Sequence, residues 1–190
     1  NIVQTTQLAE LMSEILVAGP NINLNYDSMA GTITITASAG GVGGIPVMKN
    51  LAADFDNATT TPVTVPDLTL PVLTGEVWKI EVYGRFQTAA TTTGVGLVLL
   101  APGASIITGK ETIRQAAAGT DSFFDVELKN NPDNFANTGI TAPGTDDVLM
   151  LDALVSVAAD GSLLSQFRSE VAASNAVLKA GTKLIATRIA

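Results

Sequence analysis

The stretch EVWKIEVYGRFQ, residues 76–87, decides the fold class. Its residues alternate between a mostly apolar and a mostly charged set: Trp78, Ile80, Val82, Gly84 and Phe86 against Lys79, Glu81, Tyr83 and Arg85. Successive side chains of a β-strand point to opposite faces, so this pattern predicts a strand that is buried on one side only.

Runs of strand length, each bounded by turn residues, recur on both sides of this stretch. We expect strands over residues 63–70, 94–100, 123–129, 147–158, 162–171, 176–179 and 183–189. This spacing indicates a mainly β protein with an antiparallel, jelly-roll-like β-sandwich.

Three segments between these strands have other expectations. Asp160-Gly161 predicts a two-residue turn between its flanking strands. Residues 46–61 are expected to be irregular, and residues 110–118 fit either a single helix or a long loop.

A small β-hairpin is predicted nearer the N-terminus, in NINLNYDSMAGTITITA, residues 21–37. Apolar residues alternate before and after a turn at 27–31: Ile22, Leu24 and Tyr26, then Ile33 and Ile35. A lone hairpin is marginally stable in water, so its apolar face needs a partner, either the rest of its own chain or copies of itself.

A short amphipathic helix is predicted over residues 6–16, ended by Gly19 and Pro20. It is too short to be stable alone, so it either docks on its own domain or joins a bundle of several chains. Glycines at 40–44 then separate an N-terminal trimerisation element, residues 1–45, from the sandwich, residues 46–190. The expected trimer contacts are Leu8, Leu11, Ile15, Ile22, Leu24, Ile33 and Ile35.

The composition excludes several classes of function. Only 15% of the 190 residues are charged, against about 25% in globular proteins, a surface typical of assembled or particle-bound proteins. The net charge of −8 and the scattered basic residues argue against nucleic-acid binding. Without His or Cys the chain has no imidazole base, thiolate or common zinc ligand, and no apolar run reaches the ~20 residues of a membrane span.

Candidate chemical sites each have a plainer structural interpretation. Asp54, Asp56 and Asn57 have the spacing of the start of a calcium loop, but the later ligands are missing, which favours a solvated loop. Asp125 and Glu127 share one side of a strand, as paired glycosidase carboxylates do, yet nothing distinguishes this pair from others. We therefore expect no metal, no cofactor and no catalytic site.

Glycines and isolated charges inside strands are interpreted in the same way. Gly94-Val95-Gly96 lacks the residues that follow a phosphate-binding loop, so a bulge or close packing is expected there. Arg85 and Glu170 lie in apolar strands and are expected to form ion pairs between strands or subunits. Asp146 and Asp147 are expected at the edge of a turn.

The longest polar loop, residues 130–143, is the candidate contact surface. Its expected contact residues are Asn130, Asn134, Phe135 and Asn137. The alternative is that Phe135 simply plugs the end of the sandwich.

Three segments resemble proteins of bacteriophage particles. LVAGPNINLNYDSMAGTITITAS, residues 16–38, resembles the shaft-to-tip segments of tail-fibre and spike proteins, with an Asp-x-x-Ala-Gly turn between two strands. VWKIEVYGRFQTAATTTGVGLVLLAPGA, residues 77–104, and DGSLLSQFRSEVAASNAVLKAGTKLIA, residues 160–186, are similar to β-sandwich tip or decoration domains of phage structural proteins.

The resemblance implies a non-enzymatic virion structural protein: a short homotrimeric fibre or spike that decorates the particle and contacts the host surface. The implied partners are copies of itself, other capsid or tail proteins, and a host cell-surface glycan. The missing shaft and tail adaptor leave open a capsid cement protein with a purely stabilising role. A carbohydrate-binding module and a small polysaccharide hydrolase are rivals from other classes.

Overall fold

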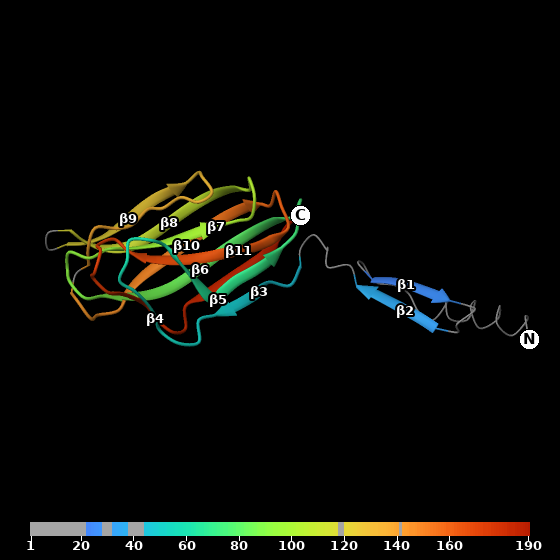
Figure 1. The fold of residues 1–190 in the computed structure, drawn as a ribbon, viewed down its shortest axis with the longest axis horizontal. Helices are drawn as coiled ribbons and strands as arrows, with labels where there is room; N and C mark the ends of the chain where they lie inside the picture. Colours follow the sequence, from blue (N-terminus) through green and yellow to red (C-terminus); the bar gives the residue numbers. More distant parts are fainter. Residues whose placement is uncertain (1–21, 28–31, 38–43, 118–119, 141) are drawn as a thin grey trace, which may run out of the picture. The chain divides into compact units, whose positions relative to one another are not determined.

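The computed structural model describes residues 22–27, 32–37, 44–117, 120–140 and 142–190 (Figure 1). The chain divides into two compact units, Asn1–Gly44 and Ile45–Ala190.

In the first unit the predicted hairpin is confirmed. β1 (Ile22–Asp27) pairs antiparallel with β2 (Thr32–Ala37), and the register places Leu24 opposite Ile35 and Tyr26 opposite Ile33. The predicted helix over residues 6–16, with Leu8, Leu11 and Ile15, lies outside the described residues.

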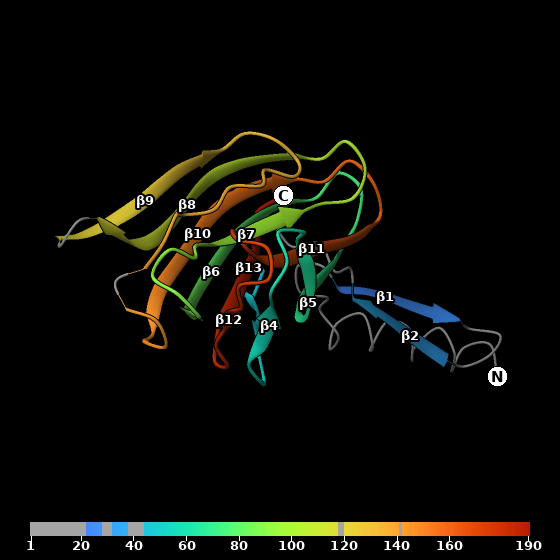
Figure 2. The same ribbon diagram turned by 60° about the vertical axis from the view of Figure 1, so that its left-hand side comes forward.

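The second unit is a sandwich of two antiparallel sheets, as predicted. The large sheet has eight strands, with the main order β3-β13-β6-β10-β8-β9; β12 pairs with β6, and β4 pairs with β12. The small sheet has the order β5-β11-β7. Figure 2 shows the large sheet curving from β9 to β6, with β7, β11 and β5 on its inner side. A jelly roll has eight strands in all, so sheets of eight and three strands are a different arrangement.

The strands of the large sheet, in chain order, are β3 (Val47–Asn50), β4 (Phe55–Asn57), β6 (Val77–Thr88), β8 (Ile106–Ala117), β9 (Thr120–Leu128), β10 (Asp147–Ser156), β12 (Ala176–Leu178) and β13 (Lys183–Arg188). Those of the small sheet are β5 (Val63–Val72), β7 (Val95–Leu100) and β11 (Gly161–Ser169).

The alternation in β6 and β10 separates a buried face from an outward one. Along β10 every second residue is buried, including Leu149, Leu151 and Val155, and the residues between them are exposed. β10 lies between β6 and β8, with Leu151 opposite Val82 of β6. The inner face of the large sheet is therefore continuous across its central strands.

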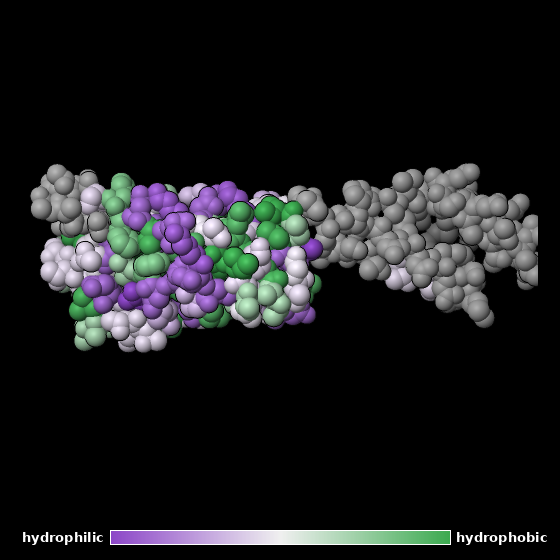
Figure 3. Space-filling model, turned by 90° about the horizontal axis from the view of Figure 1, so that it is seen from above, coloured by the Kyte–Doolittle hydropathy of each residue, from purple (hydrophilic) through white to green (hydrophobic). Residues whose placement is uncertain are grey.

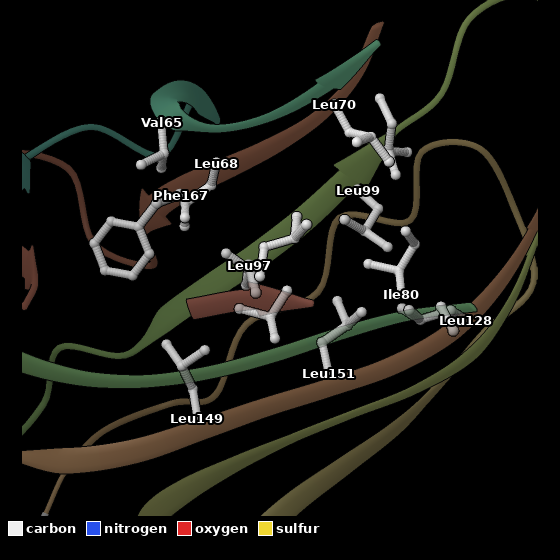
Figure 4. Packing of buried hydrophobic residues seen from close by; sticks show 14 of the residues in the cluster. Val65, Leu68, Leu70, Ile80, Leu97, Leu99, Leu128, Leu149, Leu151 and Phe167 are labelled. Atoms are coloured by element: carbon white, nitrogen blue, oxygen red, sulfur yellow. The ribbon is translucent and has the colours of Figure 1, made fainter. Parts of the chain in front are cut away.

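The core forms where this inner face meets the small sheet (Figure 4). Phe167 and Leu97 of the small sheet and Ile80 and Leu149 of the large sheet are completely buried. Burying one such side chain contributes about 1.5–3 kcal/mol, so a core built from both sheets holds the two layers together.

Two segments differ from the sequence-based expectation. Residues 46–61 are not wholly irregular, because the short strands β3 and β4 pair with β13 and β12. Residues 110–118 were expected to be a helix or loop, but residues up to Ala117 belong to β8, which pairs with β10 on one side and β9 on the other. At Gly109 a Cβ atom would lie 2.2 Å from the carbonyl oxygen of Asp152, so glycine permits this pairing.

The turn at Asp160-Gly161 also has a different role. β10 and β11 do not pair; the connection between them carries the chain from the large sheet to the small one. The carboxylate of Asp160 accepts hydrogen bonds from the backbone N–H and the hydroxyl of Thr74, both at 2.8 Å. These bonds tie the crossing to the β5–β6 connection.

We predict that Leu151→Ala lowers the free energy of unfolding by about 2–5 kcal/mol, because a buried side chain is removed and the core relaxes only partly. Denaturant titration followed by circular dichroism measures the change. Leu154→Ala is the matched control on the same strand, since Leu154 is 48% exposed; an equal loss in both variants would contradict the assigned faces of β10.

Candidate functional site

In the described part of the chain, one edge of β7 has no strand partner. Its other edge pairs with β11, whereas the free edge is hydrogen-bonded by side chains and a loop. The Val95 N–H donates to Oδ1 of Asn137 at 2.6 Å, and the Asn137 N–H donates back to the Val95 carbonyl at 3.1 Å. The Leu97 N–H donates to Oε1 of Glu111 at 2.8 Å. Buried backbone groups need such partners.

Asn131 completes the pattern beyond the end of the strand. The Ala101 N–H donates to its Oδ1, and its Nδ2 donates to the Ala101 carbonyl, both at 2.9 Å. Asn131 and Asn137 belong to residues 129–140, named here the edge loop. Their hydrogen bonds hold this loop along the free edge of β7, which it covers.

The edge loop approaches β7 so closely that side chains on the strand would collide with it. A Cβ atom at Gly94 would lie 1.6 Å from the Asn137 carbonyl oxygen, and one at Gly96 would lie 2.1 Å from that of Phe135. The predicted close packing of Gly94-Val95-Gly96 is confirmed. Because glycine has no Cβ atom, these two positions allow the loop to lie directly against the strand.

The four predicted contact residues have different environments. Asn137 is completely buried, and its Nδ2 donates to the carbonyls of Gly139 at 2.8 Å and Arg114 at 3.1 Å. It therefore stabilises the loop and does not lie on a contact surface. Asn130 and Asn134 are exposed, Phe135 is 37% exposed, and their role in contact stays a prediction.

Glu111 is a completely buried carboxyl group in the core. Oε1 accepts the Leu97 N–H, but Oε2 has no partner among the described residues. Burial raises the pKa of Glu111 to about 8, against the lowering effects of the Leu97 hydrogen bond and the Arg168 charge. Glu111 is therefore mostly protonated at neutral pH.

Arg168 links β11 to the edge loop. Its Nη2 donates to the Asn134 carbonyl at 3.2 Å. Burial lowers the pKa of Arg168, and the charges of Glu170 and Glu111 oppose that shift. The charge of Glu170 thus acts on Arg168, two residues away on the same segment, and the predicted ion pair of Glu170 between strands or subunits stays a prediction.

The candidate calcium residues serve structural contacts instead. Asp54 pairs with Lys179 and accepts the Ala180 N–H at 2.8 Å, and Asp56 accepts from Nδ2 of Asn175 at 3.0 Å. Asn57 is buried and donates to the Phe167 carbonyl at 2.8 Å. Within the described part of the chain, no group of three or more acidic residues could hold a metal ion.

The other candidate carboxylates are also paired. Asp125 lies 2.9 Å from Nζ of Lys110 on β8, and Glu127 lies 2.7 Å from Nζ of Lys129. Arg85 forms the predicted ion pair, with Asp146 at 2.6 Å.

Asp147 is buried at the start of β10 and lies 3.2 Å from Nη1 of Arg114. Asp146 lies between the turn at residues 142–145 and β10, as the predicted turn edge requires, and Asp147 is the first residue of the strand. The ion pairs of both residues help to fasten β10 to β6 and β8.

A second feature, which the sequence-based search missed, is the outer face of the large sheet, the face turned away from the small sheet. It carries seven large apolar side chains that are 40–64% exposed: Met48, Tyr83, Ile106, Phe123, Val148, Met150 and Leu154. The signal was the run VLMLDALV in β10, which is apolar at both alternating positions. Such runs are typical of strands buried on both faces.

Charged residues cross the middle of this outer face. The strand register aligns Glu81, Asp152, Lys110 and Glu127 in one row. Tyr83 and Met150 lie on one side of the row, and Leu154 lies on the other. Figure 3, seen from the β9 side of Figure 1, shows hydrophobic residues on either side of a hydrophilic band.

Charges in and beside the row are paired locally. Nζ of Lys79 lies 3.1 Å from Glu81 and 3.8 Å from Asp152, and the Tyr83 hydroxyl donates to Glu81 at 3.1 Å. The outer face therefore combines exposed apolar groups with charges that largely neutralise one another.

Comparisons with known proteins assign no family. The sequence matches no protein-family profile, and no curated protein matches it. In the part of the chain that the structure describes, no helix is long and apolar enough to cross a membrane.

Among the solved structures with distant similarity are structures of infectious bursal disease virus. The Gt strain structure matches at 15% identity and a TM-score of 0.21, covering 92% of this chain and 42% of that one. Virus-derived T=1 particles match at 12% identity and a TM-score of 0.22, with 92% and 44% covered. The chain thus spans less than half the length of these neighbours, and at such TM-scores the similarity supports no argument about function.

We predict that Asn137→Ala lowers the free energy of unfolding by about 2–5 kcal/mol, because it removes the buried acceptor of the Val95 N–H and the hydrogen bonds that Nδ2 donates to two carbonyls. Asn134→Ala, in the exposed part of the same loop, is the matched control and should stay within about 0.5 kcal/mol. Chemical denaturation measures both; a small effect of Asn137→Ala would show that the loop does not depend on this side chain.

We predict that Glu111→Gln flattens the pH dependence of stability. The pKa of Glu111 is about 8 in the folded chain and 4.5 in the reference state, so its stabilising contribution is complete below pH 4.5 and is lost as the pH rises toward 8. The loss between pH 4.5 and about 7 is on the order of 3 kcal/mol.

Denaturant midpoints measured from pH 5 to about 8.5 test this dependence. Glu111→Gln should therefore be more stable than the parent near the upper end of the range. Glu127→Gln, exposed on the neighbouring strand, serves as the control and should follow the parent curve. Parallel curves for Glu111→Gln and the parent would contradict the assignment.

Proposed function

We propose that this chain is a non-enzymatic structural protein of a bacteriophage virion, a short homotrimeric fibre or spike that decorates the particle and contacts the host surface. The observation that carries the proposal is the outer face of the large sheet. An ordinary antiparallel sheet has one face on the core and a polar face in water. Here the second face carries large exposed apolar groups, as a surface made for protein contact does.

The ionisable groups support a contact role over a catalytic one. Asp54, Asp125 and Asp146 are held in ion pairs with basic residues, and the carboxylate of Glu76 is bound by Arg188 at 2.9 Å and Trp78 at 2.9 Å. Each is used to fasten strands or turns together. Glu111 is enclosed in the core, where a substrate has no access to it.

The sequence resemblance supplies the virion context. It rests on residues 16–38, 77–104 and 160–186. These last two segments contain β6, an inner strand of the large sheet, and β11 and β7, the middle strand and one edge strand of the small sheet. In this proposal the hairpin unit is the attachment element and the β-sandwich is the knob.

Two measurements on the full chain test this proposal. Light scattering should give a mass near three times 19.5 kDa. Phage particles purified from the source strain should contain the chain, detected by peptide mass spectrometry and by antibody labelling in electron micrographs. A chain found only outside the particles would refute the virion role, and the mass of a single chain would refute the trimer.

Host contact has its own prediction, at the edge loop. We expect Phe135→Ala to reduce adsorption of the purified chain to host cells, because Phe135 is a partly exposed aromatic anchor. Leu73→Ala, at an exposed apolar residue of the β5–β6 connection, is the control away from both the edge loop and the outer face. Adsorption that is unchanged in Phe135→Ala, with the fold intact, would leave a capsid cement role as the better description.

A further inference from the structure

We propose that the outer face of the large sheet is the docking surface for a second copy of this chain. This inference rests on the self-association in the proposed function and names the surface that brings the sandwiches together. Three observations on the face carry it: the sequence of β10, the distribution of charge, and the area.

The sequence of β10 is that of a strand covered on both sides. Its inward residues pack in the core, and three of its outward residues are Val148, Met150 and Leu154, exposed by 40%, 40% and 48%. Tyr83 lies directly opposite Met150 on β6 and is 47% exposed. Val148, Met150 and Tyr83 thus form an apolar area on one side of the charged row, and Leu154 lies on the other side. In a single copy these side chains are exposed to water.

The charges on this face select a copy of the same chain as its occupant. The chain has a net charge of −8, so two copies repel each other over most of their surface. Among the described side chains, the register places five basic and five acidic residues on the outer face, a balance of 5 − 5 = 0: Lys79, Arg85, Lys110, Arg114 and Lys183 against Asp56, Glu81, Asp125, Glu127 and Asp152.

Half of the ten basic residues of the chain therefore lie on one face, where most of them pair with carboxylates. Two acidic copies can approach here without like-charge repulsion. A basic partner would be attracted to the remaining acidic surface instead.

The area is close to what a stable contact between copies requires. The patch is five strands wide, from β13 to β9, which is roughly 24 Å, and eight residues long, from the pairs of β10 with β8, which is roughly 27 Å. Its flat area is therefore on the order of 650 Å², without the added surface of protruding side chains. Specific interfaces bury about 800 Å² on each partner.

The absence of cysteine in the chain makes an introduced thiol a unique probe. Met150→Cys places it on the outer face, and Leu73→Cys places it at an exposed position, 56%, in the β5–β6 connection. Maleimide labelling is followed over a range of concentrations of the full chain, with the mass measured by light scattering in the same samples.

We expect the thiol of Met150→Cys to react at least tenfold more slowly where the chain is associated than after dilution to single chains. The thiol of Leu73→Cys should react rapidly at all concentrations. Adding Leu154→Lys to Met150→Cys should restore rapid labelling, whereas adding Leu73→Lys should not. Unchanged circular dichroism shows that the variants are folded, and Val148→Cys repeats the test if Met150→Cys itself weakens association.

Rapid labelling at position 150 in samples whose mass is that of several chains would overturn the inference and leave the proposed trimer standing on another surface. A single-chain mass at every concentration would overturn it as well. Detection of the chain in purified particles is independent of both results, so failure of the docking surface is distinguishable from failure of the virion role.

Discussion

The unpaired edge of β7 is the constraint on which the arrangement of the sandwich depends. A three-stranded sheet cannot end in the core with free N–H and carbonyl groups, because buried polar groups without partners are costly. This chain satisfies them with side chains from outside the small sheet: Asn137 and Asn131 from the edge loop and Glu111 from β8. The same hydrogen bonds fasten the loop, the small sheet and the large sheet to one another.

Pairing the edge of β7 with side chains and a loop requires particular residues at three positions. Gly94 and Gly96 are needed because the loop backbone lies where side chains would be. Glu111 accepts one backbone N–H at the cost of burying a second carboxyl oxygen without a partner. The inside of the sandwich is thus partly polar, and the exposed apolar groups gather on the opposite face of the large sheet.

Much of the fold follows from the sequence, because β6 alternates between apolar and polar residues in a way that only a strand explains. β8 was missed because Gly109 and Glu111 stand at inward positions where apolar residues are expected. β3 and β4 have only four and three residues, too few to show a period. Asn137 was assigned to a surface because a polar loop residue usually lies there; its burial depends on a strand edge 42 residues away, which no local pattern reveals.

The pairing of the large sheet also determines when the sandwich can form during synthesis. β3, the first strand of the second unit, pairs only with β13, the last, and β6 receives its neighbours β10, β12 and β13 long after it has been made. Contacts between residues so distant in sequence make folding slow. The nascent sandwich therefore cannot close on the ribosome until its C-terminal strand has emerged, whereas the β1–β2 hairpin contains only local contacts and can form well before that.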